Sequence, residues 1–105
     1  MIRVGRIVGL MPEKYEEYKK YHSEIWPEVL KKITQYNIHN YTIFYHDGKL
    51  FSYFEYNGND YEADMRNMAS ESVINKWRNL MATMQISFEE TMALWSDMEE
   101  IFHHD

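Results

Sequence analysis

Residues 38–56 read IHNYTIFYHDGKLFSYFEY, and this stretch decides the fold. It contains two runs rich in aromatic and β-branched residues, Ile38 to Tyr45 and Leu50 to Tyr56, on either side of His46-Asp47-Gly48-Lys49. Asp-Gly between two such runs is typical of a tight hairpin turn, because both central residues adopt a positive φ there. The stretch therefore predicts two paired antiparallel strands.

The residues before the hairpin predict a strand and two helices. Arg3 to Leu10 alternates weakly and is rich in Val and Ile, which indicates a strand. Pro12 suits the first turn of a helix that we expect to run to about Ile25. Pro27 can open a second helix, since the residue before a proline is pushed out of helical geometry.

The residues after the hairpin predict a turn and then helix. Asn57 to Asp60 reads as a turn and helix start. We expect Tyr61 to about Met84 to be helical, with a break near Ala69-Ser70 where Ser70 caps the second piece. Gln85 to Glu89 reads as a loop.

The C-terminal pattern is ambiguous. Leu94, Trp95 and Met98, within Thr91 to Phe102, could lie on a helix, whereas the stretch Glu100 to His103 could add an edge strand.

The order of elements, β-α-β-β-α-(β), predicts an α+β fold of the ferredoxin-like type. A hairpin flanked by helical crossovers gives an antiparallel sheet with helices on one face. At 105 residues the chain forms one domain, residues 1–105. Helices cover only one face of such a sheet, and the simplest cover for an apolar second face is another copy. We therefore expect a homodimer.

The composition excludes several classes of protein. A formal net charge of −6 argues against non-specific binding to nucleic acid or to an anionic membrane. The absence of cysteine excludes disulfides, thiolate zinc sites and cysteine nucleophiles. The first residues contain no apolar run typical of a signal peptide, and no stretch approaches the length needed to span a bilayer. We expect a cytoplasmic protein.

Tyr15, Tyr18, His22 and Ile25 are spaced 3, 4 and 3 residues apart, which puts them on one side of a helix. His22 is the leading candidate for proton transfer, because a free imidazole both takes and gives a proton near neutral pH. The alternative is a structural histidine, partly buried in the helix and bonded to a backbone carbonyl.

Aromatic residues near His22 suit a sugar, whose ring has apolar C–H faces and polar edges. Tyr18 and Tyr41 could present hydroxyls and Trp77 a stacking surface, although each could instead be a packing residue. The histidines lack metal-ligand spacing and the four glycines form no phosphate-binding pattern, so we expect no cofactor and no metal.

These residues resemble the L-rhamnose mutarotase family nearly end to end. The resemblance rests on Tyr18, His22, Ile25-Trp26-Pro27-Glu28, His39-Asn40-Tyr41 and Trp77, and on Glu99-Glu100-Ile101-Phe102 at the C-terminus. It implies a ferredoxin-like monomer that forms a dimeric α/β barrel. It also implies an enzyme that interconverts the α and β anomers of L-rhamnose.

By the same resemblance, His22 matches the family's acid/base histidine, and Tyr18 and Tyr41 match its sugar-binding tyrosines. The family usually has two adjacent tryptophans at the positions of Lys76 and Trp77, so the resemblance implies that Lys76 changes one wall of the pocket. L-fucose or another aldose is then an alternative sugar. Two other functions stay open: a non-catalytic sugar- or metabolite-binding dimeric module, and a cofactor-free monooxygenase of the same fold.

Overall fold

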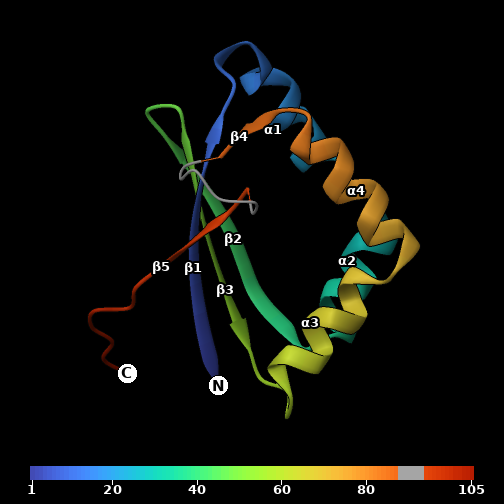
Figure 1. Ribbon diagram of the computed structural model, residues 1–105, viewed down its shortest axis with the longest axis vertical. Coiled ribbons are helices and arrows are strands. Elements are labelled where there is room, and N and C mark those ends of the chain that lie inside the picture. Colours follow the sequence, from blue (N-terminus) through green and yellow to red (C-terminus); the bar gives the residue numbers. More distant parts are fainter. Residues whose placement is uncertain (88–93) are drawn as a thin grey trace.

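One antiparallel sheet carries the helices on a single face (Figure 1). The computed structural model describes residues 1–87 and 94–105. Its elements in chain order are β1 (Ile2–Leu10), the 3-10 helix η1 (Pro12–Lys14), α1 (Tyr15–Ser23), α2 (Pro27–Gln35), β2 (Ile38–His46), β3 (Lys49–Tyr56), α3 (Tyr61–Ala69), α4 (Ser72–Ala82), β4 (Gln85–Ile86) and β5 (Ser96–Met98). None of the helices in these described residues is long and apolar enough to cross a membrane.

The strand order is β2-β3-β1-β4, and every pairing is antiparallel. β4 pairs with Gly9 and Leu10 of β1, whereas β5 pairs with residues 5–7 of the same strand. Two short strands thus occupy successive parts of one sheet edge. This arrangement confirms the predicted α+β fold with an antiparallel sheet, and the predicted hairpin, β2–β3, lies at the other edge.

The hairpin turn and the second helix form as the sequence predicted. Asp47 and Gly48 have φ values of 50° and 77°, and His46 pairs directly with Lys49. These are the positive φ values that a two-residue hairpin turn needs. Trp26 is extended, with ψ 127°, as the residue before a proline prefers, and α2 begins at Pro27.

The predicted end of the first helix was close, whereas the predicted cap at Ser70 was wrong. α1 ends at Ser23, two residues before the expected position near Ile25. Ser70 does not cap the second piece of the long helix: its hydroxyl donates a 2.7 Å hydrogen bond to the main-chain oxygen of Asn67 and closes α3. α4 follows the extended residue Glu71 without a side-chain cap.

The C-terminal third differs most from the prediction. Gln85 and Ile86 form β4 where a loop was expected, and Gly9 is needed beside them because a Cβ there would lie 2.9 Å from the oxygen of Ile86. The edge strand is β5, at residues 96–98 rather than at 100–103, which have no regular structure. Residues 88–93, where the expected loop ends and the ambiguous segment begins, lie outside the described residues.

Side chains of β3 alternate between the two faces of the sheet. Leu50, Ser52, Phe54 and Tyr56 are buried, and all but Ser52 are apolar or aromatic. Leu50 and Phe54 belong to one hydrophobic core with β1 and the helices. The other core residues include Val8, Leu10, Val29, Met68, Ile74, Trp77, Met81 and Met84.

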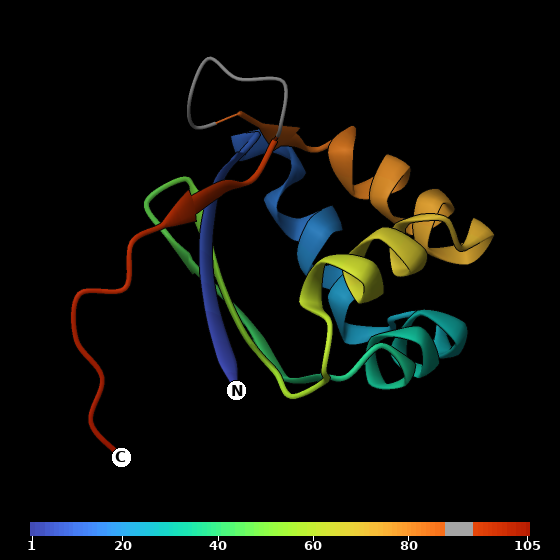
Figure 2. The ribbon, with the colours of Figure 1, turned by 60° about the horizontal axis from the view of Figure 1, so that its bottom comes forward.

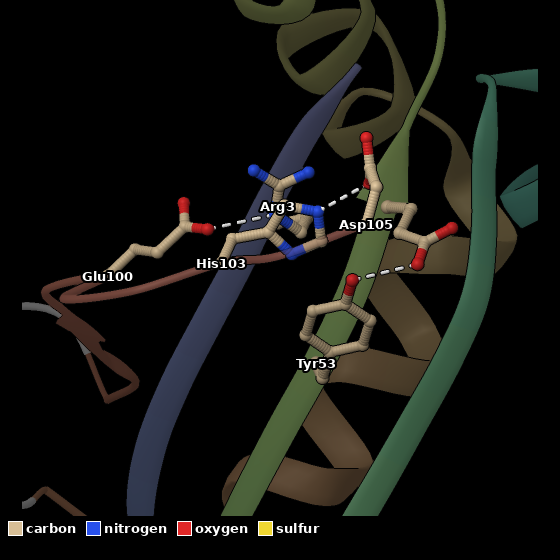
Figure 3. A network of polar contacts seen from close by, with 6 residues as sticks. Arg3, Tyr53, Glu100, His103 and Asp105 are labelled. Carbon is tan, nitrogen blue, oxygen red and sulfur yellow. Dashed lines mark hydrogen bonds and ion pairs between the residues drawn. The ribbon is translucent and has the colours of Figure 1, made fainter.

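None of the described helices lies on the outer face of the sheet (Figure 2). Phe51 and Tyr53 are only partly buried there, and residues 99–105 run along this side (Figure 2). Arg3 holds this C-terminal tail through a 2.9 Å ion pair with Glu100 (Figure 3). The tail leaves Ile101 and Phe102 strongly exposed.

Candidate active site

A cavity of about 1040 Å³ lies between the inner face of the sheet and the helices. Tyr18, His22, Tyr41 and Trp77 all line it, although they come from α1, β2 and α4. The fold therefore brings together four of the five site residues predicted from the sequence. The volume is at the upper end of the range for small-molecule sites, so the cavity has room for a monosaccharide and water.

One ring nitrogen of His22 is hydrogen-bonded to the backbone. Nδ1 lies 2.9 Å from the main-chain oxygen of Tyr18, four residues earlier in α1. A carbonyl oxygen only accepts, so Nδ1 carries the proton and donates it. In the neutral ring, Nε2 is then the basic nitrogen, and no residue of the described chain is hydrogen-bonded to it. The backbone bond matches the structural alternative for His22, but it leaves one nitrogen available for chemistry.

The surroundings of His22 favour its neutral form. Burial lowers its pKa below the ordinary value of 6.5, and the bond to the Tyr18 carbonyl only partly opposes this shift. The ring stacks on Tyr18 at 4.4 Å between centroids, and it meets Trp77 edge-on at 5.5 Å. These two aromatic rings hold the imidazole in one orientation. His22 is thus a positioned, mostly uncharged base at neutral pH.

The hydroxyl of Tyr18 is held by a residue that sequence reasoning missed. Gln85 of β4 donates a 3.1 Å hydrogen bond from Nε2 to the Tyr18 Oη, and both residues are buried. Burial raises the pKa of Tyr18 to about 12, so the phenol keeps its proton at working pH. Because Oη accepts from Gln85, its own O–H remains available to donate to a ligand.

A bulge in β2 positions Tyr41. The pairing between β2 and β3 shifts register between His39 and Thr42, and Asn40 has a φ of 52°. Asn40 tolerates this conformation and is fixed by a 2.8 Å hydrogen bond from its Nδ2 to Glu55. Tyr41 packs on Phe54 at 5.4 Å between ring centroids. The residue is 43% exposed, yet burial of its hydroxyl end raises its pKa.

Trp77 forms an aromatic wall of the cavity. It is 9% exposed and meets Trp26 edge-on at 5.1 Å as well as His22. Lys76, the fifth predicted residue, is exposed and is not among the residues that line the cavity. On α4, residues 76 and 77 point about 100° apart, so only one of them can face the sheet.

Further polar residues reach the cavity from distant parts of the chain. Arg6 of β1 pairs with Asp97 of β5 at 2.9 Å, and Arg78 follows Trp77 on α4. Trp95 also lines the cavity, next to β5. The weak alternation of β1 could have placed Arg6 on the inner face. No local pattern links Gln85 to Tyr18, or Asp97 to Arg6.

The arrangement suits acid–base chemistry on a small polar ligand. His22 offers a neutral imidazole with a free nitrogen, and Tyr18 and Tyr41 offer hydroxyls that stay protonated. An apolar wall at Trp77 complements the C–H face of a sugar ring.

Solved structures with this fold include two that match the whole chain. An L-rhamnose mutarotase from Formosa agariphila superposes with a TM-score of 0.81 at 20% identity, with 100% of both chains covered. Tetracenomycin F2 cyclase from Streptomyces glaucescens superposes with a TM-score of 0.73 at 7% identity, again over 100% of both chains. At these identities the likeness establishes the fold.

Sequence similarity identifies the family, which the structural likeness does not. Proteins named L-rhamnose mutarotase from Lactiplantibacillus plantarum and Oceanobacillus iheyensis are 33% and 34% identical to this chain over 107 residues, with 100% of both chains covered. The one from Bacillus subtilis is 33% identical over the same length and coverage. The family model for L-rhamnose mutarotase matches residues 3–104. With a full-length match in sequence and in fold, the chain belongs to the L-rhamnose mutarotase family.

Proposed function

We propose that this protein is an isomerase that interconverts the α and β anomers of L-rhamnose or a close 6-deoxy aldose. The observation that carries the proposal is the fixed imidazole of His22. Its Nδ1 is bonded to the Tyr18 carbonyl, and Nε2 remains as the basic nitrogen of a side chain that lines the cavity. Full-length relatives named L-rhamnose mutarotase support the choice of sugar.

The reaction needs two proton movements. His22 Nε2 takes the proton of the anomeric hydroxyl, the C1–O1 bond becomes a carbonyl, and the bond between C1 and the ring oxygen breaks. The ring oxygen gains a proton, which gives the open-chain aldehyde. Rotation about the C1–C2 bond and the reverse steps close the ring on the other face. General acid–base catalysis of this kind is worth about 10²–10⁴-fold in rate.

Tyr18 is suited to assist at the ring oxygen. Its oxygen accepts from Gln85 and its pKa of about 12 keeps the proton in place, so it acts as a hydrogen-bond donor. A bound water, or the imidazolium of His22 itself, then completes the proton transfer. We assign Tyr41 and Trp77 to sugar binding, with Tyr41 donating to a sugar hydroxyl and Trp77 providing the apolar wall.

We propose a cytoplasmic homodimer as the working form. The outer face of the sheet bears the partly exposed Phe51 and Tyr53, and none of the helices in residues 1–87 and 94–105 covers it (Figure 2). A second copy packed on this face would cover these side chains and leave the cavity, on the opposite side, open to substrate.

Anomer exchange measured by saturation-transfer NMR tests the proposed function. The protein is added with a chelator to L-rhamnose, L-fucose and a panel of other aldoses, and exchange is compared with buffer. We expect L-rhamnose or another 6-deoxy sugar to exchange fastest. Exchange equal to buffer for every sugar would refute catalysis. If the sugars still bound, that result would favour the non-catalytic module instead.

A further inference from the structure

The described lining of the cavity is cationic in a protein whose net charge is negative. The chain has a formal net charge of −6. Among the described residues that line the cavity, however, Arg6, Lys19 and Arg78 carry positive charge and only Asp97 carries negative charge. A neutral 6-deoxy sugar gives no reason for this local reversal of charge.

Arg6 is only weakly neutralised. Its Nε lies 2.9 Å from Oδ1 of Asp97, but the side chain of Asp97 is 80% exposed and that of Arg6 is 33% exposed. A carboxylate so open to water screens a neighbouring charge poorly, and such pairs contribute little. The guanidinium also donates to Tyr61 Oη at 3.3 Å and lies 5.5 Å from the centre of the Phe54 ring. These contacts hold it in place and leave donors available.

Arg78 has no polar partner among the described residues. Within residues 1–87 and 94–105, no hydrogen bond or ion pair is made by its guanidinium. The residue as a whole is exposed, but burial of its guanidinium end lowers its pKa; Tyr41 opposes this shift and the charge of Arg6 adds to it. Both guanidinium groups also act on the buried hydroxyl of Tyr41, where they oppose the rise in its pKa. Arg6 and Tyr41 both lie against the ring of Phe54, at 5.5 and 5.4 Å from its centre, and Arg78 lines the same cavity.

Two neighbouring guanidinium groups repel each other, and the exposed Asp97 neutralises this pair only weakly. An anion between them would relieve the repulsion. Guanidinium groups bind carboxylates and phosphates through paired N–H donors, which gives affinity as well as orientation.

We propose that Arg6 and Arg78 form a subsite for an anionic group on the sugar, so that the protein also interconverts the anomers of acidic aldoses. The group is a carboxylate, as in a hexuronate, or a phosphate ester. A hexuronate carries its carboxylate on the carbon that is a methyl group in a 6-deoxyhexose, so its charge lies at that end of the sugar. This inference rests on the proposed function, because the anion is useful only if the anomeric carbon reaches His22.

The test compares anomer exchange for L-rhamnose, D-galacturonate, D-glucuronate and D-glucose 6-phosphate. It uses the wild type, Arg78→Gln, and Arg66→Gln as a matched control. Arg66 is an exposed arginine of α3 that does not line the cavity. We expect at least one acidic aldose to exchange faster than in buffer, and Arg78→Gln to raise its KM about 10- to 100-fold, the worth of a charged hydrogen bond. That rise should exceed the change for L-rhamnose at least tenfold.

Arg66→Gln should leave every KM unchanged, and Arg78→Lys should recover part of the loss because it restores the charge. Uronates and the phosphate ester, run as separate arms, show which anion fits. Acceleration of L-rhamnose without acceleration of any acidic aldose would overturn this inference and leave the proposed function standing. Acceleration of an acidic aldose alone would support the subsite and correct the substrate. If Arg78→Gln did not fold, the wild-type rates would still decide whether any acidic aldose is a substrate.

Discussion

The main-chain oxygen of Tyr18 lies 2.9 Å from Nδ1 of His22, and the two rings stack with centroids 4.4 Å apart. A single turn of α1 thus fixes both the tautomer and the orientation of the imidazole. Tyr18 in turn is held through its hydroxyl by Gln85 from the far end of the chain. We expect catalysis to depend on these contacts, which run from Gln85 through Tyr18 to His22.

The first prediction concerns pH. Burial lowers the pKa of His22 below 6.5, so kcat/KM for anomer exchange should be constant near neutral pH and fall on the acid side with a midpoint below 6.5. The buffer-catalysed rate is measured at each pH and subtracted. An acid limb with a midpoint above 6.5 would contradict the assignment of a buried, neutral His22 as the base.

The same shift affects stability. The folded-state pKa of His22 is lower than its unfolded value, so the unfolded chain binds the proton more readily. The contribution of the neutral His22 to the free energy of unfolding is therefore fully present above the unfolded-state pKa and is lost as pH falls through the folded-state pKa. Thermal unfolding of the wild type and of His22→Gln, measured between pH 8 and 5, should show the wild type losing stability relative to the variant. The same dependence of stability on pH in both proteins would argue against a lowered pKa of His22.

The second prediction is that Gln85 positions Tyr18. Gln85→Leu should lower kcat/KM by about 3- to 10-fold, the worth of one hydrogen bond. In a Tyr18→Phe background it should have little further effect, because the bond is already absent. Additive losses in the double variant would mean that Gln85 acts on stability alone. Circular dichroism and the thermal midpoint accompany each variant.

The third prediction concerns Lys76. Its side chain is exposed and does not line the cavity, so Lys76→Trp should leave the relative exchange rates across a sugar panel unchanged within about twofold, the usual spread for a surface substitution away from a site. Trp77→Leu serves as the contrast, because Trp77 lines the cavity and should alter sugar preference. A changed preference in Lys76→Trp would restore Lys76 to the substrate-binding role that the family resemblance implies.

The fourth prediction is the homodimer. Phe51 lies on the outer face, paired with Ile7 on one side and Phe44 on the other. Phe51→Glu would place a charge in the proposed interface, so sedimentation at micromolar concentration should give a dimer for the wild type and a monomer for the variant. Thr34→Glu, at an exposed residue of α2, is the control and should remain dimeric. A monomeric wild type would refute the dimer.

Local chemistry explains what could be predicted of the fold. Asp47-Gly48 supplies the two positive φ values of the hairpin turn, and Pro27 marks the start of α2. β5 could not be found in this way. Its three residues, Ser96 to Met98, lack a strand pattern of their own, and they are strand because they pair with β1.

The same limit applies to the site. Tyr18 and His22 are four residues apart on one helix, so their shared face is visible in the sequence. The partnership of Gln85 with Tyr18 spans 67 residues and that of Arg6 with Asp97 spans 91 residues. Contacts of this kind exist only once the sheet has formed, and no helical or strand period in the sequence encodes them.

The measurement that tests the central claim most directly is anomer exchange by His22→Ala, with His39→Ala as the control. His39 is an exposed histidine bonded to Asn57, and it does not line the cavity. We predict that His22→Ala loses about 10²–10⁴-fold in the protein-dependent exchange rate of L-rhamnose. We also predict that it keeps a cooperative thermal transition, whereas His39→Ala retains the wild-type rate. Wild-type exchange by a folded His22→Ala protein would contradict the role of His22 as the proton-transfer group.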